Sequence, residues 1–269
     1  MSKILLIAWI TFKDSVREKA LYGIFLLGIV MFVANVIITG MFSWELGKVA
    51  VDVGLSIISF SGLILIFFFS IQMVSKDLEK KTVYLILSRP ISKAQYILGK
   101  YTGLGSIILF SSAVLGICAA LSVQVSTLGV EEYMPANFSW HAFFLSVAFL
   151  TLSLLVMTGI SILFVSITSH PFTAMLLALM TYFIGQNIEN VKNIIISTRI
   201  FSPDAISMKV INIVSWVLPN LAVFDLKATA AYGLPLDAMS LAWTTLYGFS
   251  YIGMCLIVTI LIFQRRELA

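Results

Sequence analysis

Long apolar runs separated by short polar stretches dominate the chain of 269 residues. A helix needs roughly 20 apolar residues to cross about 30 Å of hydrocarbon. Six runs reach or approach this length, so the pattern predicts an all-α integral membrane protein, with residues 1–269 forming a single transmembrane domain. The predicted spans are Leu21–Phe42, Val53–Val74, Tyr101–Leu121, Ala142–Ile167, Phe172–Ile188 and Met239–Phe263.

Composition supports this class. Hydrophobic residues make up 60% of the chain and charged residues 11%, with a mean hydropathy of +1.03, whereas soluble domains carry about 25% charged residues. The net charge of +4 suits anionic lipid headgroups. Aromatic residues lie in apolar runs and not among basic patches, which argues against nucleic-acid binding. Cys118 and Cys255 also lie in apolar runs and are interpreted as small core residues, without disulfide or metal spacing.

The distribution of Lys and Arg predicts the orientation. With the N-terminus in the cytoplasm, 12 of the 17 Lys and Arg residues fall on the cytoplasmic side of six spans, as the positive-inside rule requires. We therefore expect a multi-pass protein of the cytoplasmic (inner) membrane with both termini in the cytoplasm.

Two segments outside the spans show helical patterns. In residues 1–20, Ile4, Ala8, Trp9 and Phe12 recur at helical spacing, which predicts an interfacial helix; a disordered leader is the alternative. In the outer segment 189–238, Ser202-Pro203 predicts a helix start and Pro219-Asn220 its end. A second short helix is predicted over Asp225–Tyr232, with Gly233 as its cap. These outer helices either gate an exit or pack over the bundle.

The segment of residues 75–100 is the most charged part of the chain. Asp77 and Glu79 are predicted to occupy the first turn of a helix that continues through Leu87. Arg89 precedes Pro90, which disfavours helical geometry at Arg89. The first helix should therefore end in a rigid corner.

A second helix should start directly after this corner. Ser92 and Gln95 have the spacing of a capping box, and the helix then continues into the third span. The first helix carries several aliphatic residues, so it must lie on the membrane or dock into a partner. A solvated loop would need neither caps nor that many aliphatic side chains.

The run Ser88–Lys93, Ser-Arg-Pro-Ile-Ser-Lys, follows Asp77, Glu79 and Thr82. This arrangement resembles the cytoplasmic signature of the ABC-2 type transporter permeases, with Lys81 where that family usually has Gly. The resemblance extends over essentially the whole chain, from the interfacial N-terminal helix through six spans.

The resemblance implies the membrane half of an ATP-driven transporter. A second permease copy or homologue would pair with this chain, and a dimer of ABC ATPase subunits would carry ATP and Mg²⁺, so that no cofactor is bound by this chain itself. A second cytoplasmic contact would lie at Thr168 and His170. The residues implied in ATPase coupling are Asp77, Glu79, Thr82, Leu85, Ser88, Arg89, Pro90, Ser92 and Tyr96.

The chain lacks the groups for its own energy supply or catalysis. No GxxxxGK[ST] phosphate-binding loop occurs, so ATP hydrolysis belongs to another polypeptide. The predicted spans have no charged residue in their interiors, which argues against a proton-coupled carrier. His141 and His170 fall on opposite sides of the membrane and cannot share a metal ion. A membrane-embedded enzyme is therefore the weakest reading.

Four polar residues lie in or near the spans: Asn35, Gln72, Gln186 and Asn187. They either form hydrogen bonds between helices or line a translocation path. So apolar a path favours a lipid-like or amphipathic substrate, and export is the expected direction. The alternative is an ATPase-coupled mechanical transmitter that drives an extracytoplasmic partner and translocates nothing.

Overall fold

A computed structural model describes residues 3–17, 20–41, 46–79, 91–127, 138–168, 170–198 and 213–265. Its regular elements are all helical in these ranges. The elements are α1 (Lys3–Arg17), α2 (Ala20–Gly40), α3 (Leu46–Ile64), η1 (Leu65–Ser70), α4 (Ile71–Glu79), α6 (Lys93–Thr127), α7 (Trp140–Ile167), α8 (Pro171–Thr198), η3 (Ala222–Phe224), α10 (Lys227–Tyr232) and α11 (Ala238–Arg265).

Five helices in the described part of the chain are long and apolar enough to cross a membrane. They cover Gly47–Leu78, Lys93–Thr127, Trp140–Ile167, Pro171–Ile194 and Ala238–Arg265. The first predicted span corresponds to α2, whose apolar stretch Leu26–Gly40 is shorter than these five. The fold class is confirmed as an all-α multi-span protein, and the sixth span stays a prediction.

Several predicted boundaries differ from the structure: for example, α3 starts at Leu46 where the span was predicted from Val53, and α6 ends at Thr127 where the span was predicted to end at Leu121. The second span is part of one continuous helical rod, α3–η1–α4, which runs on to Glu79. The fifth span was predicted to end at Ile188, but α8 continues to Thr198. Apolar residues at helical spacing, such as Val191 and Ile194, extend the helix past the polar pair Gln186-Asn187.

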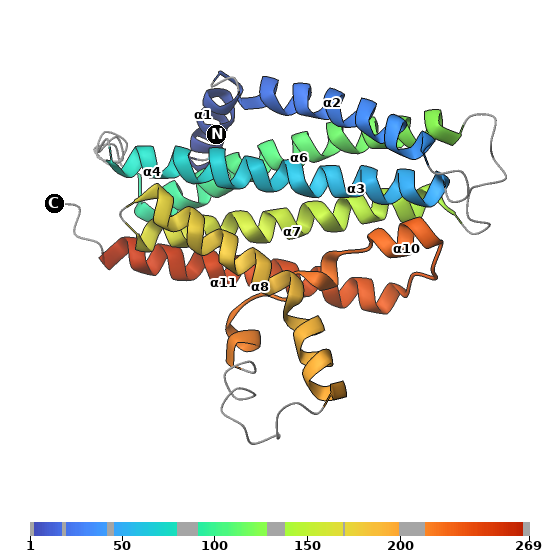
Figure 1. The fold of residues 1–269 in the computed structure, drawn as a ribbon. Coiled ribbons are helices and arrows are strands. Elements are labelled where there is room, and N and C mark those ends of the chain that lie inside the picture. Colours follow the sequence, from blue (N-terminus) through green and yellow to red (C-terminus); the bar gives the residue numbers. More distant parts are fainter. Residues whose placement is uncertain are drawn as a thin grey trace.

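The long helices form an elongated bundle (Figure 1). Helix α7 is the most central element, since it packs against α3, α6, α8 and α11. The ends of α4 and α11 meet the start of α6 at one end of this bundle. This end of the bundle contains an ion pair between Asp77 of α4 and Lys100 of α6, and we call it the lock end. The opposite end of the bundle is called the far end.

Helix α1 packs closely on the first turns of α6. A Cβ atom placed on Gly99 would lie 2.6 Å from Cβ of Ile7, and one on Gly103 would lie 2.7 Å from Cβ of Thr11. Two glycines four residues apart allow such close helix approach. The opposite face of α1 exposes apolar side chains, including Trp9. A helix is therefore confirmed in this segment, and its location in the membrane interface stays a prediction.

The chain between α8 and α11 folds back against both helices. The Leu221 amide donates to the Gly185 carbonyl at 2.9 Å, and the Asn220 amide donates to the Tyr247 hydroxyl at 2.9 Å. The Tyr251 hydroxyl donates to the Val217 carbonyl at 3.0 Å. These bonds satisfy non-helical backbone that lies deep along α11.

The two short helices predicted in this segment have different outcomes. The second is confirmed as α10, which ends at Gly233 with φ of 64°. Residues 213–217 are helical and stop before Pro219, as predicted. The predicted start at Ser202-Pro203 lies outside the described residues.

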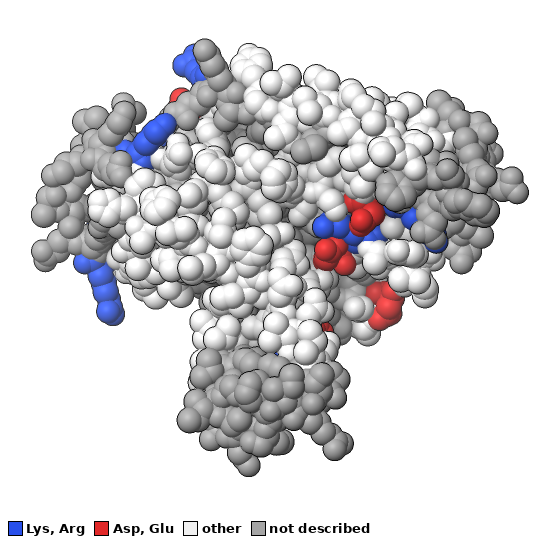
Figure 2. Space-filling view, viewed as in Figure 1, with Lys and Arg blue, Asp and Glu red and all other residues white. Residues whose placement is uncertain are grey.

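Charged side chains avoid the middle of the bundle. On the face shown in Figure 2, described Lys, Arg, Asp and Glu side chains gather mainly near the two ends, and most of the surface between them is uncharged. This distribution fits helices whose middle sections lie in hydrocarbon.

Candidate functional site

The lock end contains a buried ion pair that joins α4 to α6. The Lys100 ammonium lies 2.6 Å from Oδ2 of Asp77, with side-chain exposures of 7% and 21%. The same carboxylate oxygen accepts a hydrogen bond from the Tyr96 hydroxyl at 2.9 Å. Because Tyr96 and Lys100 are four residues apart, they share one face of α6. The two helices that precede and follow the predicted corner, α4 and α6, are thus held together by this ion pair and hydrogen bond.

The position of Asp77 and Glu79 corrects the sequence interpretation. Both were predicted in the first turn of a new helix, but α4 begins at Ile71 and continues the rod from α3. Asp77 therefore does not complement a helix N-terminus. Its charge is compensated instead by Lys100, which favours the ionised form of this half-buried carboxylate.

The start of α6 is also fastened to the end of α11. The predicted capping box is confirmed: the Gln95 amide donates to Oγ of Ser92 at 3.2 Å, and the Ser92 amide donates to Oε1 of Gln95 at 3.1 Å. The Lys93 ammonium donates to the Gln264 carbonyl at 3.2 Å, near the C-terminus of α11, where a cation is favourable.

Aromatic stacking adds an apolar contact between the same two helices. The rings of Tyr96 and Phe263 stack with centroids 5.9 Å apart, and both side chains are fully buried. The described contacts next to the predicted corner therefore join α6 to both α4 and α11.

The structure places only some of the predicted coupling residues. Thr82, Leu85, Ser88, Arg89 and Pro90 lie outside the described residues. Ser92 is exposed, whereas Tyr96 is buried and turned toward Asp77. In this conformation Tyr96 makes its contacts within the chain, with Asp77 and Phe263, and has no exposed surface for a partner.

The predicted second contact lies between α7 and α8. The Thr168 hydroxyl donates to the Phe164 carbonyl at 2.8 Å and so closes the end of α7. His170 is exposed, and its carbonyl accepts the Ala174 amide at 3.2 Å in the first turn of α8. Pro171, the next residue, lines one cavity with Lys76 of α4. The α7–α8 connection and the end of α4 therefore lie on the same end of the bundle.

The four polar candidates for a pathway do not form one site. Asn35 is buried and donates to the Ala50 carbonyl at 3.2 Å, while its side-chain oxygen accepts from Thr39 at 3.1 Å. It thus joins α2 to α3, as the first interpretation predicted. Gln186 donates weakly to the Tyr182 hydroxyl at 3.5 Å, and Asn187 donates to its own helix. Gln72 is exposed and lines the cavity beside α8.

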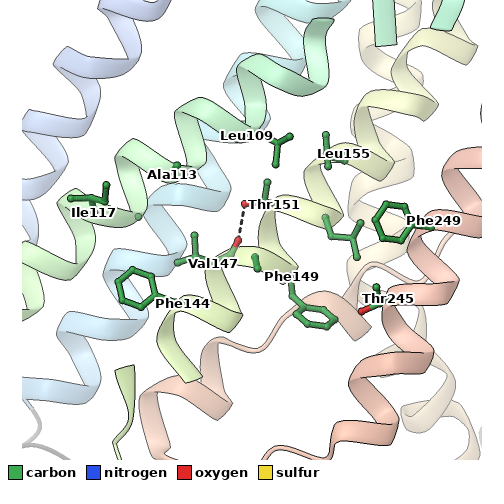
Figure 3. Close-up of a pocket in the computed structure, with 13 residues that line it drawn as sticks. Leu109, Ala113, Ile117, Phe144, Val147, Phe149, Thr151, Leu155, Thr245 and Phe249 are labelled. Carbon is green, nitrogen blue, oxygen red and sulfur yellow. Dashed lines mark hydrogen bonds between the residues drawn. The ribbon is translucent and has the colours of Figure 1, made fainter. Parts of the chain in front are cut away.

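An apolar groove lies between α6, α7 and α11 (Figure 3). Its volume is about 530 Å³, and its walls include Ile117, Phe144 and Phe249. Its two hydroxyl groups, on Thr151 and Thr245, donate to carbonyls of their own helices at 2.7 and 2.8 Å. The groove therefore presents no free hydroxyl donor and is suited to hydrocarbon.

Sequence reasoning missed Lys100 and Phe263 as parts of the lock end. Lys100 was counted among the charges of a cytoplasmic loop, although it is 6% exposed. A Lys four residues after a Tyr, at the entry to an apolar helix, was the available signal. Its acidic partner depends on the packing of α4 against α6 and could not be assigned from spacing.

The structure adds no metal centre to this description. In the described ranges, no group of three or more His, Cys, Asp and Glu residues could hold a metal ion.

The helices that are long and apolar enough to cross a membrane define the chain as a multi-pass membrane protein. A comparison with protein families matches residues 5–268 to the ABC-2 family transporter proteins. The chain therefore belongs to this family and is a membrane transporter subunit of the permease type. No curated protein matched the sequence.

Proposed function

We propose that this chain is the permease subunit of an ATP-binding cassette exporter powered by a separate ATPase subunit dimer. The observation that carries the proposal is the double fastening of α6, to α4 by Asp77–Lys100 and to α11 by Lys93–Gln264. These contacts involve the described helices on either side of the predicted corner at Ser88-Arg89-Pro90, which itself lies outside the described residues. Family membership supports an ABC ATPase as the partner at this corner.

The fastened helices supply a mechanism for coupling. An ATPase that moves the corner pulls on residues 91 and 79, the described positions that flank it. Because Asp77 and Lys100 are paired, α4 and α6 move as one body instead of separating. The close contact of Gly99 and Gly103 with α1 passes the same movement to α1. The exposed His170 is the proposed second contact with the ATPase.

The substrate proposed is lipid-like or amphipathic. The polar pathway candidates are scattered: Asn35 is used between α2 and α3, and Asn187 bonds to its own helix. The groove between α6, α7 and α11 is apolar. A second permease copy would cover part of the exposed apolar surface, to which Trp216, 89% exposed, belongs.

The test is site-specific photo-crosslinking in native membranes. A photoreactive amino acid at Leu85, Ser92 or His170 is expected to capture the ATPase subunit, and one at Trp216 is not. The same chain carrying Arg89→Glu should lose the crosslink from Leu85 while the chain remains in the membrane. Equal capture at Trp216, or no capture at the three lock-end positions, would contradict the proposal.

The mechanical transmitter remains the second candidate, and one observation favours it. Residues 213–217 project from the bundle (Figure 1), while the following Val217–Leu221 backbone is tied to α8 and α11. A projecting segment that is bonded to two long helices could transmit their movement to an outer partner. Crosslinks from Trp216 to a different protein, lost when the ATPase is inactive, would support the transmitter over the exporter.

A further inference from the structure

An exposed ridge runs along the α3–η1–α4 rod to the lock end. Phe60, Phe68, Gln72 and Lys76 are exposed and recur at spacings of four or eight. In an α-helix a spacing of four residues drifts by about 40° around the axis per step. The π-helical segment Leu65–Ser70 is wider, with i→i+5 bonding, and turns less per residue. It therefore offsets the drift and keeps the ridge on one side.

A cavity of about 320 Å³ lies between this ridge and the start of α8. This volume falls within the range of small-molecule sites, roughly 300–1,000 Å³. Its lining divides into two parts. The apolar part comprises Phe67, Phe68, Ile71, Pro171, Phe172 and Met175, and the polar part comprises Gln72, Ser75 and Lys76.

The rod side of the cavity changes with depth, whereas the α8 side, formed by Pro171, Phe172 and Met175, is apolar from the lock end inward. Lys76 precedes Asp77 of the lock end, and Phe68 lies eight residues earlier, about 12 Å deeper along the rod. The rod wall of the cavity thus changes from cationic Lys76 at the lock end, through Gln72, to aromatic Phe68 toward the bundle middle. A phospholipid has the same order, a phosphate headgroup above an acyl chain. Basic pockets between membrane helices recognise such headgroups.

We propose that this cavity binds one phospholipid with an anionic headgroup, from the leaflet at the lock end. Lys76 and Gln72 contact the phosphate, and Phe68, Phe172 and Met175 hold the first part of an acyl chain. The neighbouring acidic group Asp77 is neutralised by Lys100, 2.6 Å away. The bound lipid joins α4 to α8, the helices that flank the two proposed ATPase contacts. The binding proposal itself does not depend on the proposed function.

The test is native mass spectrometry of the full chain, purified in mild detergent and titrated with phosphatidylglycerol or phosphatidylethanolamine. One phosphatidylglycerol should be retained more tightly than phosphatidylethanolamine. Lys76→Gln should weaken phosphatidylglycerol binding by about five- to tenfold, since one cation near a headgroup contributes about that factor. The matched control Lys13→Gln removes an exposed cation of α1 that does not line the cavity, and it should leave the affinity unchanged.

A second variant tests the contribution of the lipid acyl chain separately from that of the headgroup. Met175→Trp fills the cavity without changing charge and should weaken the binding of both lipids. Equal loss with Lys13→Gln, or unchanged binding in both Lys76→Gln and Met175→Trp, would overturn the proposal. Displacement of phosphatidylglycerol by excess glycerol 3-phosphate would assign the site to a free phosphate compound and would also overturn it.

Discussion

Removal of Lys100 tests whether the Asp77–Lys100 pair fastens α4 to α6. Lys100→Met keeps the length of the aliphatic stem and deletes the ammonium. The substitution removes the ammonium from beside the Asp77 carboxylate, which is 21% exposed, and keeps the hydrogen bond from the Tyr96 hydroxyl. Breaking a buried pair from one side costs about 3–5 kcal/mol. Because Asp77 keeps contact with solvent, we expect a loss near the lower limit, about 3 kcal/mol.

Removing both charges should be less harmful than removing one. In Asp77→Asn/Lys100→Met no uncompensated charge remains, and replacing both members of a buried pair is often nearly neutral. We therefore expect the double variant to be more stable than Lys100→Met alone. The coupling energy between the two sites should be about 2 kcal/mol, within the range of about 0.5–3 kcal/mol for residues in contact.

The assay is denaturant unfolding of the purified chain in mild detergent, followed by tryptophan fluorescence. The control is Lys93→Met, which removes a less buried cation bonded to the Gln264 carbonyl and should lower the free energy of unfolding by at most about 1 kcal/mol. If Lys100→Met is as stable as this control, or if the effects of Asp77→Asn and Lys100→Met simply add, the pair does not fasten the two helices.

Three further substitutions test the packing around the lock end and the far end. Gly103→Leu should detach α1 from α6, because even a Cβ atom would lie 2.7 Å from Thr11; faster protease cleavage within α1 would show this, and unchanged cleavage would contradict it. Gly185→Ala should lower thermal stability, since its Cβ would lie 2.6 Å from the Pro219 carbonyl oxygen, a backbone atom, and wild-type stability would refute the close approach. Asn35→Leu should lower the free energy of unfolding by about 1–3 kcal/mol, because its buried hydrogen bonds to Ala50 and Thr39 are lost. A loss no larger than that caused by an alanine substitution at an exposed position would contradict the role of Asn35 in joining α2 to α3.

The sequence predicted those features that depend on local pattern. Apolar runs located the long helices, and the Ser92–Gln95 spacing located the start of α6 because a capping box involves only neighbouring residues. Gly233 was predicted as a helix cap for the same reason, since its left-handed conformation, with φ of 64°, favours glycine.

Features that depend on packing between distant segments were not predictable in the same way. Asp77 was interpreted from its local charge pattern as an N-terminal residue of a helix, while its partner Lys100 is 23 residues away. The contact of Gly185 with Pro219 requires the chain after α8 to fold back, which no local pattern indicated. The π-helical segment Leu65–Ser70 is an apolar run like its neighbours and gave no signal of its own.

We expect a separate ATPase to act on the predicted corner between α4 and α6. The most direct measurement is purification of the tagged chain from native membranes in mild detergent, with quantification of the copurifying proteins by mass spectrometry. We expect an ABC ATPase subunit in a one-to-one ratio, lost from Arg89→Glu and retained by the control Lys13→Glu. A purified chain with intact fold and no ATPase, or an ATPase retained equally by Arg89→Glu, would contradict the account.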